Sequence, residues 1–279
     1  MAFLGDSVAR NHMQSLICLL SRVEYPKDDS SGDHGELTSK HYITYNFTLA
    51  NFWSPYLVKY EKVQNNGSGI GNLFNLYLDE LDEEWTRKIS EFDYVIVSAG
   101  HWFALPAAFY INRERIGCHS CKLENVSDLT TFYGYQMAIR STFEALNGME
   151  NYKGITYLRT FSPSHFENGT WDHGGHCHRT KPYKRNETTL EGDSLKYYII
   201  QLEEFKKAKE EGEKRGLKHR LLDITRVMLL RPDGHPDTHG HWIHDQRILH
   251  NDCLHWCLPG PIDTWNDFLL HMIQMESKS

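Results

Sequence analysis

The sequence lacks the features that mark several classes of protein. Its 279 residues include no apolar run near the roughly 20 residues that a helix needs to cross a bilayer. No basic segment followed by a long apolar one, as in a secretory signal, precedes residue 5. Basic residues form no stripe and the net charge is −7, which disfavours a nucleic-acid partner. We therefore expect a globular chain with no membrane span and no nucleic acid as a partner.

Two familiar site motifs are missing as well. The G-x-S-x-G motif, which places the nucleophile of α/β-hydrolases on a sharp turn, occurs nowhere in the chain. Residues 65–71 are rich in glycine, but they lack the Lys-Ser/Thr ending of a phosphate-binding loop, and no strand leads into them. We expect this segment to be a flexible loop.

The residues that are present favour an α/β fold. Apolar residues make up 40% of the chain and aromatic residues 13%, ample for the core of one large α/β domain or of two small ones. Strand-like runs alternate with segments of helical period, as in α/β proteins. The helix expected at 190–216 is heavily charged and should be a solvated outer face, and 24–40 should be a loop. The predicted strands lie at residues 1–4, 41–49, 92–98, 154–161 and 219–225, and the other predicted helices lie at 8–20, 131–147 and 263–275.

Two features suit an oxidising, secretory compartment. The chain has six cysteines, an even number that is compatible with disulfides. It also has five N-x-S/T sequons for glycosylation, at Asn46, Asn66, Asn125, Asn168 and Asn186. Because no targeting segment accompanies these features, we expect the chain to be truncated.

Three residues near opposite ends of the chain form a candidate catalytic set. Ser7 follows Gly5 and Asp6 at a turn between a short strand and a helix, whose first backbone N–H groups can stabilise an oxyanion. Asp252 precedes His255 by three residues, so its carboxylate can orient an imidazole that removes the Ser7 proton. Each motif alone also fits a chance match or a helix cap. Together they predict serine acyl-transfer chemistry.

Longer segments around these residues carry a family resemblance. They are residues 3–11 (FLGDSVARN), 98–103 (SAGHWF), 162–171 (SPSHFENGTW), 231–236 (RPDGHP) and 251–266 (NDCLHWCLPGPIDTWN). Together they resemble the plant trichome birefringence-like family of PC-esterase-type polysaccharide O-acetyltransferases, and are nearer to its xyloglucan branch than to its xylan branch. The resemblance implies an α/β three-layer sandwich similar to the GDSL/SGNH esterases, with a central, mostly parallel sheet flanked by helices.

The resemblance also implies roles for individual residues. Ser7 would form an acetyl-enzyme, His255 would be the general base, and Asp252 would orient that base. The backbone of Ser7 would supply one oxyanion donor. Gly100 and Asn168 are candidates for further donors, although Asn168 also begins a sequon.

Candidate substrate-binding residues lie in the same segments. Arg10 and Asn11 follow Ser7 by one helical turn, and they could equally buttress the site or cap local backbone. Structural roles are just as open for the remaining candidates, which follow strand ends, where binding residues gather. They are His101, Trp102, His165, Glu167 and Trp171.

Two histidine-rich clusters raise the question of a metal. One comprises His173, His176, Cys177 and His178, and the other comprises His235, His239, His241 and His244. The resemblance implies a disulfide for the cysteine in the first cluster, and acyl transfer by a serine triad needs no metal. We therefore expect neither a metal nor a cofactor.

The cysteines separate into two groups. By resemblance, Cys177 would pair with Cys253 and tie down the loop that carries Asp252, and Cys118 and Cys121 lie close enough to pair with each other. Complete family members carry a membrane anchor and a cysteine-bearing lobe before the G-D-S segment. Neither is visible here, so residues 1–279 are expected to be a catalytic domain alone. The usual partners of Cys18 and Cys257 would then be missing.

The expected function is O-acetyl transfer to a hydroxyl of a plant cell-wall polysaccharide in the Golgi lumen. Xyloglucan is the favoured acceptor, with mannan, xylan and pectin as alternatives, and acetyl-CoA is one candidate acetyl donor. Two other classes of function stay open. The same triad with water as acceptor makes a carbohydrate esterase, and a truncated chain could bind the wall without catalysis.

Overall fold

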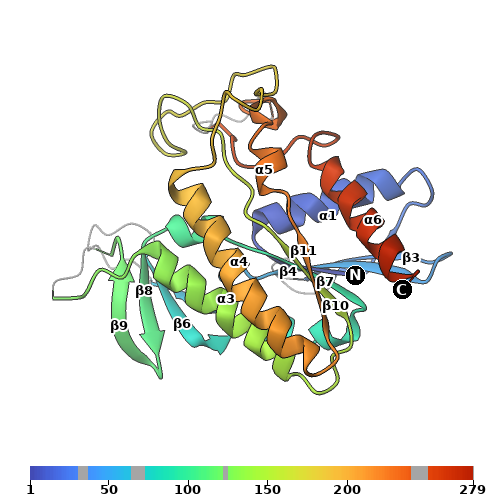
Figure 1. The fold of residues 1–279 in the computed structure, drawn as a ribbon, viewed down its shortest axis with the longest axis horizontal. Helices are drawn as coiled ribbons and strands as arrows, with labels where there is room; N and C mark the ends of the chain where they lie inside the picture. Colours follow the sequence, from blue (N-terminus) through green and yellow to red (C-terminus); the bar gives the residue numbers. More distant parts are fainter. Residues whose placement is uncertain (31–36, 64–72, 122–124, 240–250, 279) are drawn as a thin grey trace.

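A seven-stranded sheet runs through the middle of the protein, and its central strand leads directly to Ser7 (Figure 1). The computed structural model describes residues 1–30, 37–63, 73–121, 125–239 and 251–278. Strand β1 (Ala2–Gly5) lies between β7 (Tyr94–Ser98) and β4 (Phe47–Trp53) and is parallel to both. The full order is β11-β10-β7-β1-β4-β3-β2, where the other strands are β10 (Ile155–Arg159), β11 (Lys218–Leu222), β3 (Leu37–Tyr42) and β2 (Lys27–Asp28).

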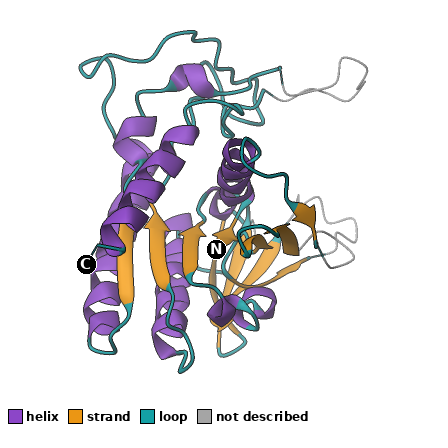
Figure 2. Cartoon of the chain, turned by 90° about the vertical axis from the view of Figure 1, so that its right-hand side faces the viewer, coloured by secondary structure: helices purple, strands orange, loops and turns teal. Residues whose placement is uncertain are grey.

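Helices cover both faces of this sheet, so the predicted three-layer α/β class is confirmed (Figure 2). Successive side chains of a strand point to opposite faces. Ala2 and Leu4 accordingly pack in the cluster that includes α3 (Thr131–Gly148) and α4 (Gly192–Glu213). Phe3 packs in the cluster that includes α1 (Ser7–Leu20) and α6 (Asp263–Glu276). Since both faces are buried, β1 is apolar throughout rather than alternating.

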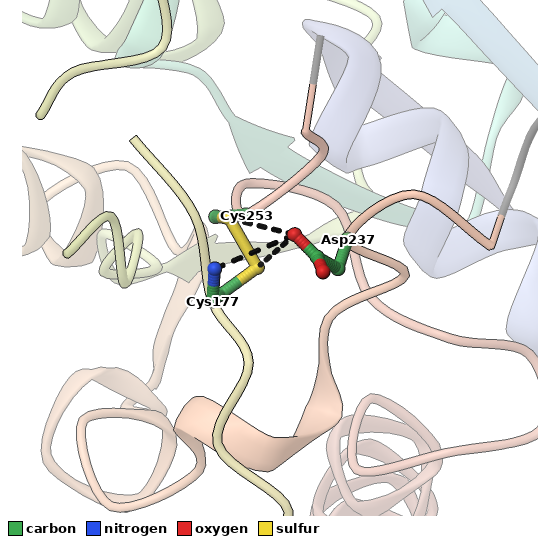
Figure 3. A group of neighbouring side chains, drawn as sticks. All are labelled: Cys177, Asp237 and Cys253. Atoms are coloured by element: carbon green, nitrogen blue, oxygen red, sulfur yellow. Dashed lines mark hydrogen bonds between the residues drawn. A yellow bond between two sulfur atoms is a disulfide. The ribbon is translucent and has the colours of Figure 1, made fainter. Parts of the chain in front are cut away.

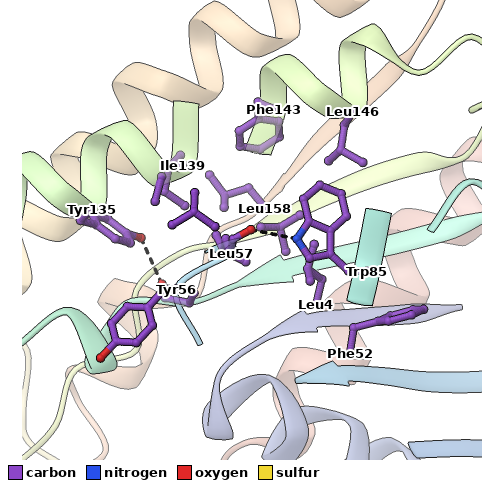
Figure 4. Packing of buried hydrophobic residues seen from close by; sticks show 14 of the residues in the cluster. Leu4, Phe52, Tyr56, Leu57, Trp85, Tyr135, Ile139, Phe143, Leu146 and Leu158 are labelled. Atoms are coloured by element: carbon purple, nitrogen blue, oxygen red, sulfur yellow. Dashed lines mark hydrogen bonds between the residues drawn. The ribbon is translucent and has the colours of Figure 1, made fainter. Parts of the chain in front are cut away.

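A second sheet, which the sequence analysis did not predict, packs against α3. It has the order β5-β6-β8-β9, formed by β5 (Val58–Lys62), β6 (Phe74–Leu81), β8 (Ala107–Ile111) and β9 (Glu114–His119). Its buried face continues the core under α3, where Trp85 of the short helix α2 (Glu83–Thr86) donates to the carbonyl of Leu57 at 2.8 Å (Figure 4). Short turns of helix complete the described chain: η1 (Ile89–Glu91), η2 (His101–Ala104), α5 (Thr225–Met228) and η3 (Pro232–Gly234).

Three element predictions need correction. Residues 24–40 were expected to be a loop, but β2 and the start of β3 lie within them and pair with each other. Residues 65–71, also expected to be a loop, lie outside the described residues. Residues 41–49 were expected to form one strand, but β3 ends at Tyr42 and a turn closed by Asn46, at φ 45°, leads into β4. The helix predicted at 190–216 is present as α4, yet it is more than a solvated face. It buries Tyr197 and Phe205, among others, against the core that α3 shares. The many charged residues elsewhere on α4 made this buried apolar face hard to recognise in the sequence.

The carboxyl ends of the parallel strands converge at one end of the sheet, where the long loops gather (Figure 2). Ligands of open α/β sheets bind at this edge. Ser7 follows β1 there, and the segments after β7 and β10 lie beside it. No helix in the described part of the chain is long and apolar enough to cross a membrane.

Candidate active site at the carboxyl end of the sheet

The turn between β1 and α1 presents Ser7. Gly5 has a φ of +149°, and a Cβ on it would lie 1.7 Å from the carbonyl oxygen of Ser98, so glycine is required here. Asp6 caps α1, because its Oδ1 accepts from the backbone N–H of Val8 at 3.0 Å. The backbone N–H of Ser7 has no acceptor among the described residues. It lies at a helix N-terminus, where the helix dipole favours negative charge.

His255 stands between Ser7 and Asp252 in a chain of hydrogen bonds. Its Nε2 lies 2.7 Å from Ser7 Oγ, and its Nδ1 lies 2.9 Å from Asp252 Oδ2. A carboxylate accepts, so Nδ1 carries the proton and Nε2 is left to accept from the serine hydroxyl. Burial raises the pKa of Asp252, but hydrogen bonds from the ring and backbone of His255 outweigh it and lower the pKa to about 2. This arrangement can activate a serine as a nucleophile.

Asp6 also holds the segment that follows β7. Its Oδ2 accepts from the backbone N–H groups of Gly100 at 3.1 Å and His101 at 3.3 Å. The N–H of Gly100 is therefore occupied, and its predicted place in an oxyanion hole is not supported by this geometry. Burial raises the pKa of Asp6, and the positive charge of Arg159 opposes that rise.

Asn168 does not supply the oxyanion donor in place of Gly100. Its side chain is exposed, and its Nδ2 lies 3.0 Å from Nε2 of His176. Of the three candidate donors, the backbone N–H of Ser7 is the one that is free.

A buried cation lies beneath the nucleophile. Arg159 is only 2% exposed, donates to the carbonyl of Thr160 at 2.9 Å and to Oγ of Ser98, and lies 5.0 Å from the ring centroid of Trp265. Burial lowers its pKa to about 10, which leaves it charged at neutral pH. Its charge therefore compensates that of Asp6 below Ser7.

The loop that carries His255 is fixed by the side chains of other elements. Asn11 binds both backbone groups of Trp256: its Oδ1 accepts from the N–H at 2.8 Å, and its Nδ2 donates to the carbonyl at 3.2 Å. The indole of Trp256 donates to Ser162 Oγ at 2.8 Å. His235 bonds the carbonyl of His255 at 2.7 Å. Asn11 is thus a buttress of the loop and not, as one prediction had it, a substrate ligand.

A disulfide joins Cys177 to Cys253, the neighbour of Asp252, as the resemblance implied (Figure 3). Beside it, Asp237 and Asp252 exchange two backbone hydrogen bonds of 2.9 Å, so Asp252 is held on both sides. Cys118 and Cys121 form a second disulfide on the smaller sheet. Among the described residues, Cys18 and Cys257 are free, and Cys18 is exposed.

The first histidine cluster does not converge as a metal site. His176 and His178 stack at 4.2 Å, and His178 pairs with Asp237 at 3.2 Å. Asp237 and the two disulfide sulfurs have ligand atoms close together, but those sulfurs are already bonded to each other (Figure 3). His173 pairs with Asp172. In the second cluster, His235 binds the loop of His255, His239 bonds the carbonyl of Pro236 at 3.3 Å, and His241 and His244 lie outside the described residues.

A groove of about 620 Å³ opens next to the loop that carries His255. It reaches Leu254, the neighbour of His255, and it is walled by aromatic side chains that include Trp102 and the half-exposed Trp171. His101 also lines it. Its ring packs at a tilt against Phe161, with the ring centroids 4.5 Å apart. Burial lowers its pKa to about 3, and its Nε2 is buried without a hydrogen-bond partner among the described residues.

The remaining substrate-binding candidates have other partners. Arg10 lies over Trp53, at 5.4 Å, and Trp53 contacts Trp102 edge to face. Glu167 bonds Arg179 and the Tyr183 hydroxyl. Both ring nitrogens of His165 are engaged, one by His235 and one by the carbonyl of Leu229. Glu167 and His165 therefore serve the structure around the groove.

Sequence reasoning missed several residues that build the site. Asp6 was within the quoted G-D-S motif, and its helix-capping position was the one available signal. His235, Asp237 and Ser162 act through contacts with residues 252–257, which no local pattern reveals. Of the five sequon asparagines, four are exposed, and Asn66 lies outside the described residues.

Known proteins resemble this chain over most of its length. The sequence model of the GDSL/SGNH-like acyl-esterase family found in Pmr5 and Cas1p matches residues 1–272. Protein trichome birefringence-like 19 of Arabidopsis thaliana is 54% identical over 99% of this chain and 65% of its own length. Protein trichome birefringence-like 20 of the same plant is 52% identical over 98% of this chain and 57% of its own length. Xyloglucan O-acetyltransferase 4 of Populus trichocarpa is 43% identical over 98% and 64%, so the chain spans less than two thirds of each relative.

Proposed function

Since the chain belongs to the GDSL/SGNH-like acyl-esterase family found in Pmr5 and Cas1p, we propose that it is an O-acetyltransferase acting on a plant cell-wall polysaccharide, with xyloglucan as the acceptor. The observation that carries the proposal is the unbroken hydrogen-bond chain from Ser7 through His255 to Asp252, with contacts of 2.7 and 2.9 Å. The neutral Nε2 of His255 faces the hydroxyl whose proton it would remove.

The proposed reaction has two half-reactions. In the first, His255 Nε2 takes the Ser7 proton while Oγ bonds to the acetyl carbon, and the departing group of the donor leaves with that proton. In the second, His255 takes the proton of a sugar hydroxyl, whose oxygen attacks the acetyl carbon and displaces Oγ. Ser7 then recovers a proton from His255. Asp252 stabilises the imidazolium present in both steps.

The backbone N–H of Ser7 is the proposed oxyanion donor. It is free, and it lies at the N-terminus of a helix of 14 residues. Asp6 contributes indirectly, because it caps that helix and fixes the segment at Gly100 and His101. A rigid position for the donor matters, since misplacement of a catalytic group by about 1 Å can reduce the rate a hundredfold.

The groove beside the triad is the proposed acceptor site. Trp102 and Trp171 offer flat apolar faces that suit sugar rings, and His101 lines the same groove. Relatives of 41–43% identity named xyloglucan O-acetyltransferases support the choice of acceptor. Two disulfides and four exposed sequon asparagines are compatible with the Golgi lumen, which we propose as the compartment. Acetyl-CoA is the first acetyl donor to test.

Hydrolysis is the second candidate function. The family is described as acyl-esterases, and the same triad with water in place of the sugar hydroxyl releases acetate. The two functions differ in whether the acetyl-enzyme meets a bound acceptor before it meets water.

The decisive experiment compares the wild-type protein with Ser7→Ala. Each is incubated with acetyl-CoA, or with an aryl acetate ester, and with xyloglucan, xylan or mannan oligosaccharides, and products are identified by mass spectrometry. One acetyl group gained by an acceptor, and lost in Ser7→Ala, supports transfer and identifies the polymer. Free acetate without acceptor labelling supports the esterase. If Ser7→Ala is as active as the wild type, the proposed nucleophile is wrong. Ser21→Ala, a partly buried serine just beyond α1 whose hydroxyl bonds the carbonyl of Cys18, is the matched control.

A further inference from the structure

Behind the loop of His255, two buried histidines connect two backbone carbonyls. His235 Nδ1 lies 2.7 Å from the carbonyl oxygen of His255, and His235 Nε2 lies 2.7 Å from His165 Nδ1. His165 Nε2 in turn lies 3.1 Å from the carbonyl oxygen of Leu229. Both rings are at most 9% exposed. Each end of this hydrogen-bonded series faces a carbonyl oxygen, which can only accept. One of the two oxygens is the backbone carbonyl oxygen of His255, the proposed general base.

The three contacts need three N–H donors, whereas two neutral imidazoles carry only two. If both rings donate to the carbonyls, His235 Nε2 and His165 Nδ1 face each other as two lone pairs at 2.7 Å. If one ring donates to the other instead, one carbonyl faces a lone pair. A single additional proton resolves the conflict, because three donors then meet three acceptors and one of the bonds is charge-assisted.

The surroundings act on this proton in opposite directions. Burial lowers the pKa of both rings, that of His235 to about 4, and a charge on His165 lowers the pKa of His235 further. Nearby carboxylates act the other way, and the completed third hydrogen bond favours the first proton. The pair therefore titrates as a unit. The titratable and charged groups that face it are Glu167, Tyr183, Arg231, Asp233, Asp252, His255 and His101.

We propose that His165 and His235 share one proton, and that this protonated pair positions the catalytic loop through the carbonyl oxygen of His255. The inference rests on the proposed function, because it assigns the pair a role in the reaction of that same site. Neither ring contacts Ser7, so both are positioning residues. When the shared proton is lost, one of three hydrogen bonds breaks and His255 is aligned less firmly with Ser7. We therefore expect kcat to fall on the alkaline side of the pH profile while KM for the acceptor stays constant.

The shared proton can be observed without any assay of activity. In protein labelled with nitrogen-15 at histidine, nuclear magnetic resonance should detect three ring N–H protons for the pair, two facing carbonyls and one bridging the rings. The bridging signal should disappear at a single pH and be missing in His165→Gln. It should persist in His219→Gln, which alters a buried histidine that bonds Asn147 at 2.7 Å on the far side of the sheet. If only two such protons are present at every pH at which the protein is folded, the proposal is wrong.

Kinetics of two variants test the positioning role. His165→Leu removes the ring and should lower kcat about fivefold, because a buried hydrogen bond is worth about 1 kcal/mol and each 1.4 kcal/mol is a factor of ten. The side chain of His165→Gln brings two N–H donors that do not titrate, so it should recover most of that loss and remove the alkaline decline. An alkaline decline that persists unchanged in His165→Gln contradicts the proposal.

These outcomes distinguish a failure of the proposed histidine pair from a failure of the proposed reaction. If the wild type transfers no acetyl group and hydrolyses no ester, the proposed function fails, while the resonance experiment still decides whether the proton is shared. If His165→Leu does not fold, His165→Gln alone tests the pH profile. His219→Leu is the control for a buried histidine lost elsewhere, and it should lower stability while the shape of the pH profile is retained.

Discussion

Ser7 and His255 come from two regions of the molecule that are stabilised by different means. Ser7 rests on regular structure: β1 is fully buried, both of its neighbours are parallel strands, and α1 begins at Ser7 itself. His255 lies in a segment, residues 251–262, that forms no strand or helix. That segment is held by individual side chains, among them the amide of Asn11 and the disulfide to Cys177.

This difference predicts how each region responds to change. The backbone bonds of a sheet are numerous and shared among neighbouring strands, so the loss of one side chain moves the backbone little. The contacts of the 251–262 segment are few and most involve a side chain, so the loss of one side chain leaves buried partners without a bond. Activity should therefore be more sensitive than overall stability to changes around His255. Around Ser7, the chemistry of the side chain itself should matter most.

The largest effect should come from Ser7→Ala. Removal of the nucleophile of a triad lowers kcat about a thousandfold or more. The free energy of unfolding should change by less than about 1 kcal/mol, because one partly solvated hydrogen bond is lost and the turn is formed by Gly5 and Asp6. Transfer assays and thermal unfolding measure both quantities. A variant that unfolds readily would show that the nucleophile region depends on its side chains after all.

Next in size is the loss of the Cys177–Cys253 disulfide by a double change to serine. The bridge spans 76 residues, so its removal should lower the free energy of unfolding by about 2–5 kcal/mol. It should also lower kcat at least about tenfold, because Cys253 adjoins Asp252.

The matched control for that variant is the double change of Cys118 and Cys121 to serine. This bridge spans 3 residues on the smaller sheet, so its loss should lower the free energy of unfolding less. It should leave kcat unchanged. Equal kcat values for the two double variants would show that the long disulfide does not position Asp252.

A smaller effect is expected for Asn11→Leu. The change leaves the N–H and the carbonyl of Trp256 unpaired in a buried place, which should reduce stability by about 2 kcal/mol and kcat about fivefold. Asn147→Leu is the control, since it is also buried and bonds the carbonyl of Ala208 at 2.9 Å. It should destabilise to a similar degree with kcat retained. A parallel fall of kcat in both variants would mean that general loosening, not the position of His255, limits the reaction.

The same contrast explains how much the sequence could predict. Ser7, Asp252 and His255 were predictable because each belongs to a local pattern, a glycine turn or an i,i+3 pair, and β1 and α1 have clear apolar periods. The disulfide of Cys177 came from family resemblance. The fold class followed from alternating strands and helices.

The rest of the site depends on contacts between residues far apart in the chain. Asp6 and Gly100 are 94 residues apart, and Asn11 and Trp256 are 245 apart. Whether a backbone N–H faces solvent or a carboxylate is decided by the packing of β1 against β7, so the oxyanion role of Gly100 could not be tested from the sequence. The second sheet was missed for a related reason. Its edge strands are partly exposed, and their pairing partners define them better than their composition.

The smallest predicted effect compares two carboxylates, one in each region. The pKa of Asp252 is lowered from 3.8 to about 2, so its charge stabilises the fold above pH 4, and that contribution is lost as the pH falls through 2. Burial raises the pKa of Asp6, so its ionised form is disfavoured by folding. Its contribution is most favourable below pH 3.8 and is lost as the pH rises through the folded pKa.

Unfolding of Asp252→Asn and Asp6→Asn between pH 2 and pH 6 tests this opposition. The deficit of Asp252→Asn relative to the wild type should shrink by about 2 kcal/mol on acidification. The deficit of Asp6→Asn should grow under the same change, because the wild type then gains a neutral Asp6. Carbon-13 titration of the two carboxyl groups measures the cause directly. If both stability deficits change with pH in the same direction, the folded protein stabilises Asp6 as an anion. Arg159 and the three N–H groups that donate to Asp6 would then outweigh the effect of burial.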